Sequence, residues 1–520
     1  MNNKFIKILK DNFWLFFFFV IVLMALTYGV WQQSYSWYFQ DETDHLVPAW
    51  MTLKYNWLVY KDFTTNHQPI PILYSLFILK LAKFKTLWQL IPQVRLLMLF
   101  VSGIFGIFSL LRFRYRGLIS WSIFSFLSYY FFGFHVLGEV FAAYAILVIT
   151  SYWLFTKKVH NLDVILFGLA LFFAGFSLLP SIIYLLVVTI LFIRKLRRQQ
   201  VILLLVSVLI PTALLFIYIP FFDWWRETIV YNWKYWLPLK EKTSFWQYIE
   251  MVFYPINSLF LASTWSRINL FYFVSLIIMV LPVLDSHDHK LKKFARLMGC
   301  LLILGLLNNR VIKADALFYE GFHLLPYLAG FITLLTQQII SNLKNPGLKY
   351  LRNGLLIILF LTITPWVVTP TNRLNQYTEH YSSQQNLADI LITLKSDGDR
   401  FLSGPDGAGY INIVSNLPIA GRQLFHLNWS WEVPALREEF QTLFEKKPPE
   451  FVLFYNDGGQ HAKYLQPILK AKYLNTYNSS GDITFFFILK EKWSQLSPDQ
   501  KQVVNQHYLL VPKTKKVKHD

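Results

Sequence analysis

The sequence has little charge and almost no cysteine. Only 15% of its 520 residues are charged, whereas 55% are hydrophobic, and an ordinary soluble domain carries roughly 25% charged residues. This number of charged residues is too small to cover a surface that faces water. We therefore expect much of the surface to face lipid. The single cysteine, Cys300, excludes an intramolecular disulfide and leaves the redox compartment open. The sequence also lacks internal repeats, low-complexity segments and metal-binding spacings.

Acidic residues are scarce relative to basic ones. The chain has 49 Lys and Arg against 30 Asp and Glu, a net charge of +19. Such an excess can indicate nucleic-acid binding, but here the basic residues cluster between apolar runs rather than on a soluble module. We therefore predict no nucleic-acid partner and interpret these residues as anchors for anionic membrane lipids. The 48 Phe, 29 Tyr and 18 Trp also favour a membrane, because aromatic rings prefer the lipid–water boundary.

Long apolar runs predict about eleven membrane-spanning helices. A span needs about 20 mostly apolar residues, since every backbone group must bond within its own segment. The run 12–30 carries no charge and ends without a small-residue cleavage site, so we predict a retained first span rather than a signal peptide. Further runs lie near residues 91–111, 117–136, 140–156, 162–177, 179–193, 201–220, 268–284, 294–307, 319–340 and 353–369.

Basic clusters in alternate loops predict the orientation. They place the N-terminus in the cytoplasm, with the cluster 112–116 on the inner side of the membrane. This holds only if the apolar stretch 70–84 does not span. It is short, is interrupted by Pro69 and Pro71 and contains two lysines, so we predict an interfacial helix on the outer face. Eleven spans then place the C-terminus outside the cytoplasmic membrane.

The composition divides the chain into two domains. Residues 1–370 form the transmembrane module, with a first outer loop at 31–90 and an aromatic outer loop at 221–265. Residues 371–520 are polar and predict a soluble extracytoplasmic α/β domain, with a helix at 384–395 and buried strands at 400–403, 450–454 and 483–489. Its two Gly-rich turns do not have the spacing of a phosphate-binding loop. The predicted fold class is thus an α-helical polytopic membrane protein with a C-terminal α/β domain.

The first outer loop opens with a dense group of ionisable residues, Asp41-Glu42-Thr43-Asp44-His45. Two interpretations remain open. The group could be a helix N-cap with solvated charges, because Asp is a favoured capping residue. Alternatively, carboxylates gathered at a membrane surface could form a functional site.

Four short motifs follow one another within residues 41–96. They are Asp41-Glu42, the turn 57–63 with Tyr60 and Asp62-Phe63, the segment His67-Gln68-Pro69, and a span beginning Arg95-Leu96. Their order resembles the polytopic glycosyltransferases of the GT-C superfamily, especially the bacterial branch with protein O-mannosyltransferases and the lipid A aminoarabinose transferase. The family commonly has two prolines after the histidine, and Gln68 here replaces the first.

This resemblance implies a reaction and roles for individual residues. The donor would be a polyprenyl-phosphate sugar, and Asp41 would be the general base that deprotonates the acceptor hydroxyl. Glu42 would orient Asp41, or hold a divalent metal ion such as Mg²⁺ or Mn²⁺ with it. Arg95, His67 and Lys61 would contact the donor phosphate, because the leaving group develops negative charge.

Two further sites follow from the same resemblance. Glu139, in the second outer loop, would match a second catalytic acid of the family, although an acid at a helix start also complements the helix dipole. Arg310, Tyr319 and His323 could line the donor cavity, or could anchor a kinked helix at the membrane surface.

We therefore predict a membrane glycosyltransferase (a hexosyl- or pentosyltransferase) of the cell envelope, similar to a mannosyltransferase. The acceptor hydroxyl would belong to a lipid, a glycan or a protein. The alternatives are a polysaccharide polymerase or ligase, and a transporter of lipid-linked sugars. A transporter is expected to have paired repeats and charges at mid-membrane, whereas the charges here gather at helix ends.

Overall fold

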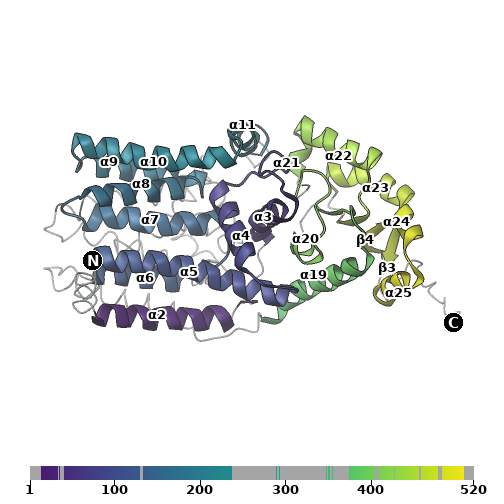
Figure 1. Cartoon of the computed structure of the whole chain (residues 1–520), viewed down its shortest axis with the longest axis horizontal. Coiled ribbons are helices and arrows are strands. Elements are labelled where there is room, and N and C mark those ends of the chain that lie inside the picture. The colour runs from purple at the N-terminus through teal and green to yellow at the C-terminus, as the bar shows by residue number, and fades with distance from the viewer. Residues whose placement is uncertain are drawn as a thin grey trace.

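The computed structural model describes residues 13–32, 34–35, 40–128, 133–236, 374–404, 409–424, 426, 428–455, 458–477 and 483–508, with a few isolated positions between 289 and 354. A helical bundle occupies one end of the long axis, and an α/β region containing the C-terminal residues occupies the other (Figure 1). The bundle contains α2 (Phe13–Gln32), α5 (Leu87–Phe113), α6 (Tyr115–Ser128), α7 (Gly138–Phe155), α8 (Asn161–Gly175), α9 (Ile182–Ile193) and α10 (Arg198–Tyr218).

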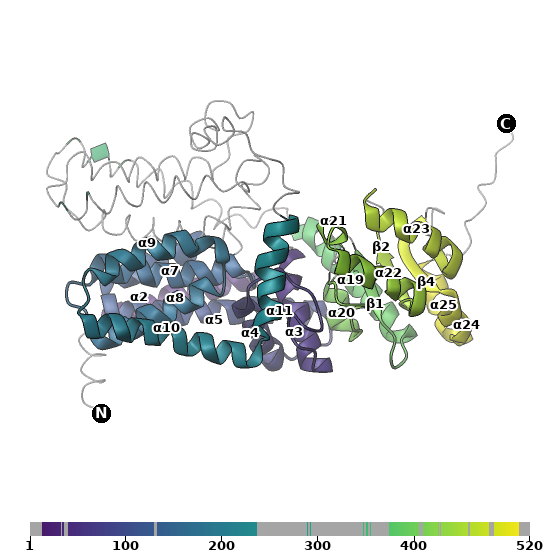
Figure 2. The same cartoon turned by 90° about the horizontal axis from the view of Figure 1, so that it is seen from above.

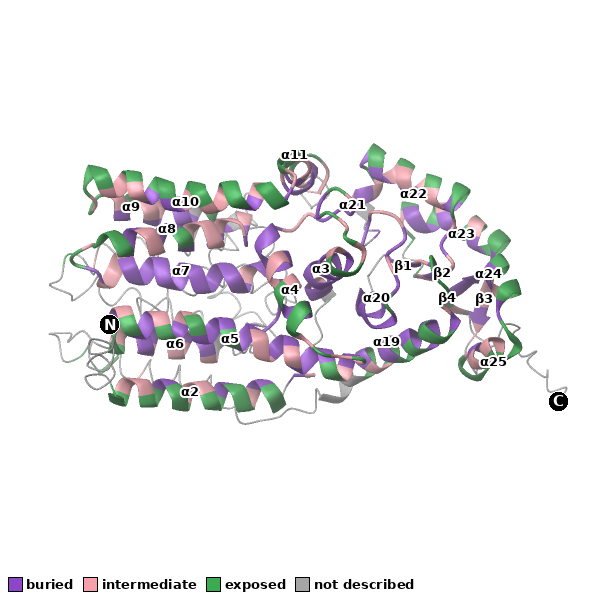
Figure 3. Cartoon of the chain, viewed as in Figure 1, coloured by how far each residue is buried: buried purple, intermediate pink, exposed green. Residues whose placement is uncertain are grey.

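Four of these helices, α2, α5, α7 and α10, are long and apolar enough to cross a membrane. The central helix α7 is 78% buried over its most apolar window, whereas α2 and α10 are only 17% buried (Figure 3). Apolar helices that expose most of their residues fit contact with lipid. The chain is therefore a helical integral membrane protein. The helices from α5 to α10 coincide with predicted runs, and the four runs after residue 267 lie outside the described residues.

Side-chain contacts fix the neighbours within the bundle. The Arg112 guanidinium at the end of α5 donates two hydrogen bonds to Asp163 at the start of α8, at 2.5 and 2.8 Å. Phe167 of α8 stacks on Phe192 of α9, with ring centroids 3.9 Å apart. The bidentate pair ties together two helix ends that the sequence places in adjacent inner loops.

The first outer loop folds into a short 3-10 turn, η1 (Gln40–Glu42), and two helices, α3 (Thr43–Tyr55) and α4 (Pro69–Leu81). Helix α4 is the apolar stretch predicted to lie at the interface. It begins at Pro69, which suits the first helical position because its missing N–H needs no partner there. Its 13 residues are too few to span a bilayer. The two helices lie between the bundle and the α/β region (Figures 1 and 2).

The turn η3 (Leu179–Ser181) connects α8 to α9 within the bundle. After α10, the chain continues into α11 (Phe221–Trp225) and the π-helical segment η4 (Arg226–Trp236). The last two are the described part of the aromatic outer loop predicted at 221–265. They lie beside the α/β region (Figure 1).

The α/β region contains α19 (Leu374–Leu394), β1 (Phe401–Gly404), α20 (Gly409–Ser415), α21 (Asn428–Trp431), α22 (Pro434–Lys446), β2 (Phe451–Phe454), α23 (Gln460–Lys472), β3 (Tyr473–Tyr477), β4 (Ile483–Leu489), α24 (Lys490–Gln495) and α25 (Pro498–His507). The sheet order is β1-β2-β4-β3, with β1 and β2 parallel and the other pairs antiparallel. Three strands match the predicted ones. Strand β3 was missed because it is a polar edge strand, paired only with β4 in the described sheet.

The α/β region is docked on the first outer loop. A Cβ atom on Gly409 of α20 would lie 2.8 Å from Thr43 Cβ and from Val47 Cγ2 of α3, so only glycine permits this approach. The backbone N–H of Leu87 in α5 also donates to Gln385 Oε1 of α19, at 2.7 Å. These contacts place side chains of the α/β region beside the acidic group of the first outer loop.

Candidate functional site

The acidic group lies at the start of α3. The helix begins at Thr43, and Glu42 occupies the capping position without a hydrogen bond from its side chain to the helix. The Glu42 side chain therefore does not cap this helix. Its carboxylate turns instead toward the bundle and the α/β region.

Glu42 lies at the centre of a buried polar cluster. Its Oε1 accepts hydrogen bonds from Arg95 Nη1 and from the Val136 backbone N–H, the latter at 2.9 Å, and its Oε2 accepts from the Tyr410 hydroxyl at 2.6 Å. The Glu42 and Arg95 side chains are only 0% and 3% exposed. Burial alone would raise the pKa of Glu42, but the Arg95 guanidinium, with His135 and Tyr410, lowers it to about 2. Glu42 is thus held as a carboxylate.

These hydrogen bonds limit what Glu42 can do chemically. Its Oε1 already accepts two hydrogen bonds, so a metal ion would bind more readily at Oε2, which accepts from Tyr410. Among the residues that the structure describes, no group of three or more His, Cys, Asp or Glu side chains is placed to hold a metal ion. Arg95 retains one buried atom, Nη2, that has no hydrogen-bond partner in the described part of the chain.

A second polar pair joins Asp44, in the first turn of α3, to His67, which precedes α4. Asp44 Oδ2 is 2.7 Å from His67 Nε2, and the two side chains are 13% and 31% exposed. Burial alone would lower the pKa of His67, but Asp44, with Asp41 and Glu139, raises it above its ordinary value. Burial raises the pKa of Asp44, and His67 opposes that shift. The charges of three carboxylates, one of them in direct contact, therefore act on one imidazole.

The turn 57–63 positions His67. Its Asp62 carboxylate accepts from the Leu58 N–H at 2.7 Å, and its Tyr60 adopts a left-handed backbone, with φ of 68°. The buried Tyr60 hydroxyl then donates to the His67 backbone carbonyl at 2.7 Å. A left-handed backbone is uncommon for a tyrosine and persists only where the surroundings require it. The motif that resembles the GT-C family is thus a strained turn that fixes the histidine.

A small cavity of about 40 Å³ opens beside this pair. Asp44 and the segment 64–67 line one side, and Gln423, Trp429 and Ser430 of the α/β region line the other. The Asp44 Oδ1 atom is buried and has no protein hydrogen-bond partner in the described residues. A cavity of this size holds a water molecule or a single polar group. Since a buried acceptor normally has a partner, Asp44 is suited to receive a hydroxyl group there.

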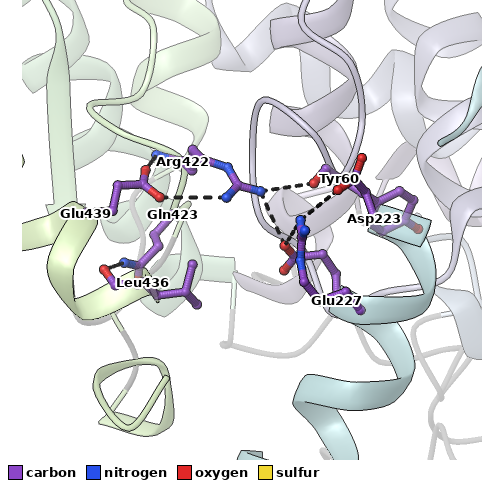
Figure 4. Close-up of polar contacts among 8 residues, drawn as sticks. Tyr60, Asp223, Glu227, Arg422, Gln423, Leu436 and Glu439 are labelled. Atoms are coloured by element: carbon purple, nitrogen blue, oxygen red, sulfur yellow. Dashed lines mark hydrogen bonds and ion pairs between the residues drawn. The ribbon is translucent and has the colours of Figure 1, made fainter. Parts of the chain in front are cut away.

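A three-way junction supports the segment 60–67 (Figure 4). Arg422 Nη2, from the α/β region, donates to the Tyr60 backbone carbonyl at 3.1 Å and lies 3.3 Å from Glu227 Oε1 of η4. Glu227 is buried and also contacts Arg226 at 3.2 Å. Burial raises the pKa of Glu227 to about 7, although both arginines lower it. On the same side, Asn232 Nδ2 donates to the Asn66 carbonyl at 3.2 Å.

The structure brings together most of the residues predicted from the sequence. Asp41, Glu42 and Glu139 lie with Arg95 and His67 around the start of α3. Lys61 is the exception. Its side chain is exposed on the turn after α3 and forms no ion pair among the described residues. Arg310, Tyr319 and His323 lie outside the described residues.

Sequence analysis did not find the partners that come from the α/β region and η4. Tyr410, Arg422 and Glu227 stand alone in their local sequence and match no motif. For the Asp44–His67 pair, the sequence showed only that Asp44 belongs to the acidic group. Its pairing with His67 depends on a separation of 23 residues that no local pattern specifies.

The chain was compared with protein families, curated proteins and solved structures. No protein-family model matches the sequence, and no curated protein matches it. Two crystal structures of ArnT from Cupriavidus metallidurans are similar, one in the apo state and one bound to undecaprenyl phosphate. They share 12% and 13% sequence identity with the chain, cover 90% of it and 97% of their own length, and have a TM-score of 0.45. ArnT is a lipid A aminoarabinose transferase of the GT-C superfamily, the branch that the outer-loop motifs resemble.

Proposed function

We propose that the protein is a glycosyltransferase that moves a sugar from a polyprenyl-phosphate donor to an acceptor hydroxyl at the outer face of the cytoplasmic membrane. The observation that carries the proposal is the cluster of Asp41, Asp44 and Glu139 around His67, next to the buried Glu42–Arg95 pair. The N-terminus would lie in the cytoplasm and the α/β region outside. The order of the four outer-loop motifs supports the same activity independently of the structure.

The reaction needs a base beside a cation. The bond between the anomeric carbon and the phosphate oxygen breaks, the acceptor oxygen bonds to that carbon, and the acceptor proton passes to a carboxylate. We assign this proton to Asp41 and propose that Glu139 shapes the same acidic pocket. The departing phosphate gains charge, which a protonated His67 and the unpartnered Nη2 of Arg95 would stabilise. The raised pKa of His67 favours its charged form.

The remaining predicted residues receive lesser roles. Glu42 would orient Arg95 and connect the first outer loop to Tyr410, rather than react. A divalent ion, if one is used, would bind Asp41 together with Glu42 Oε2, which accepts from Tyr410 and retains a second lone pair. Lys61 would meet the donor phosphate only from solvent. Arg310, Tyr319 and His323 remain candidates for the donor cavity.

The test is the release of polyprenyl phosphate by purified protein in lipid, supplied with labelled polyprenyl-phosphate sugars. Asp41→Asn should abolish release, since an amide cannot accept the proton. The matched control is Asp397→Asn, which removes an exposed carboxylate from the α/β region. Release that persists in the Asp41 variant would contradict the assignment of the base and make Glu139 the next candidate. Movement of the lipid across the bilayer without sugar release would favour the transporter alternative.

A polymerase or ligase is the second candidate function, because it shares the donor chemistry and the need for a base. The product distinguishes the two functions. A transferase of this kind adds one sugar to each acceptor, whereas a polymerase adds a series whose length grows with the donor supply.

A further inference from the structure

A second site lies on the first outer loop, away from the acidic cluster. It is an open groove of about 670 Å³ between the ends of α3 and α4 and the start of α5. This volume falls within the range of about 300–1,000 Å³ that is typical of ligand sites. Lys54, the last basic residue of α3, lies ten positions after Asp44, or about 15 Å along a helix at 1.5 Å per residue. The groove is therefore distinct from the pocket beside His67.

The groove is strongly cationic. Lys54, Lys80, Lys83 and Lys85 line it, and none of its lining residues is acidic. All four lysines are exposed, and none forms an ion pair within the part of the chain that the structure describes. Lys54 also lowers the pKa of the nearby Lys395, an effect added to that of burial. Within the described residues, no acidic side chain forms an ion pair with the lysines of the groove.

Side-chain hydrogen bonds hold the residues that form one wall of the groove. Gln93 Oε1 accepts from the Lys83 N–H at 3.0 Å, and Gln93 Nε2 donates to the Lys83 carbonyl at 2.8 Å. Gln89 Oε1 accepts from the Lys85 N–H at 2.7 Å. The connection between α4 and α5 is therefore fixed before any ligand arrives.

The groove is also amphiphilic. Trp50 and Phe84 form an aromatic base, with ring centroids 5.8 Å apart, and Lys54 Nζ lies 5.1 Å from the Trp50 ring centroid. Leu53 and Leu81, at the groove and beside it, are 38% and 51% exposed. Lysines around an apolar base match a ligand with an anionic head and a hydrocarbon body.

We propose that this groove binds the phosphate headgroup of an anionic phospholipid from the surrounding bilayer. Charge complementarity selects an anion, and the apolar base and exposed leucines select an amphiphile. The donor phosphate must lie beside the acidic cluster, so a phosphate about 15 Å farther along α3 is a separate one. A bound headgroup would neutralise the lysines and hold together the ends of α3, α4 and α5.

The experiment uses the full-length protein in micelles that contain equal amounts of phosphatidylglycerol and phosphatidylcholine, with retained lipids measured by native mass spectrometry. The wild type should retain phosphatidylglycerol in preference. A lysine near a membrane surface contributes about 1 kcal/mol, so Lys80→Ala with Lys83→Ala should weaken that retention roughly 30-fold. Lys80→Arg with Lys83→Arg should preserve it, as should a control variant with Lys446→Ala and Lys470→Ala, two exposed lysines of the α/β region.

Three outcomes would overturn the proposal. Equal retention of both lipids by the wild type would show no headgroup selection. Unchanged phosphatidylglycerol retention in the Lys80→Ala, Lys83→Ala variant would place the lipid elsewhere. In a parallel arm, lysine-dependent retention of polyprenyl phosphate without phosphatidylglycerol would make the groove a second donor site. Because none of these readouts uses sugar transfer, they test the groove independently of the proposed activity.

Discussion

The buried Glu42–Arg95 pair gives the sharpest prediction. Removing one partner of a buried ion pair leaves the other charge without compensation, which destabilises a protein by about 3–5 kcal/mol. Both side chains are at most 3% exposed, so water cannot replace the lost partner. Glu42→Ala also removes the acceptor of the Val136 N–H, and an unsatisfied buried group adds about 1–3 kcal/mol. We expect a loss of at least about 4 kcal/mol.

The assay is equilibrium unfolding in mixed micelles, followed by tryptophan fluorescence. It should cover Glu42→Ala, Arg95→Ala and the double variant. Residues that share one buried network are not additive, so the double variant should lose less free energy of unfolding than the two single losses combined. Glu42→Gln should be the mildest change, because the amide oxygen still accepts from Val136 and Arg95.

One result would refute this reasoning. If Glu42→Ala has the unfolding free energy of the wild type and yet transfers no sugar, Glu42 takes part in the reaction and does not organise the site. Wild-type stability with full activity would mean that the carboxylate has neither role.

The remaining predictions concern proton binding and packing. Asp44→Asn should keep partial activity but lower the pKa of His67. The alkaline limb of the pH–kcat profile should then move to lower pH, and a limb that stays at the wild-type pH would exclude a role for the His67 imidazolium. The folded protein holds the Glu227 proton more tightly than the unfolded chain does, so the free energy of unfolding should fall by roughly 3 kcal/mol as pH rises from about 4.5 to about 7. Glu227→Gln should remove most of that loss. The same dependence of the unfolding free energy on pH in the variant and the wild type would contradict this. Gly409→Ala should lower the free energy of unfolding by about 1–3 kcal/mol in the same assay, because the added methyl group pushes α20 away from α3. An unchanged unfolding midpoint would show that the two helices can move apart without loss of stability.

Much of the fold could be predicted from the sequence. Apolar runs located the described bundle helices, because a helix in lipid must satisfy its backbone internally and must be apolar along its length. The run predicted at 117–136 extended too far, since α6 ends at Ser128. The prolines at the start of α4 and its short length identified it as a helix that does not span. The buried strands β1, β2 and β4 were also evident as short apolar runs, whereas the polar edge strand β3 was not.

The sequence also determined which residue types gather in the first outer loop, and their order pointed to the candidate chemistry. It could not determine their partners. Glu42 had two open interpretations until the structure placed it against Arg95, 53 residues away, and Tyr410, 368 residues away. Whether a carboxylate caps a helix, binds a substrate or forms a buried pair depends on its surroundings, because burial and a neighbouring charge shift its pKa in opposite directions. Local sequence sets helical periodicity and hydrophobicity, but only the tertiary structure decides which distant groups share a water-free environment.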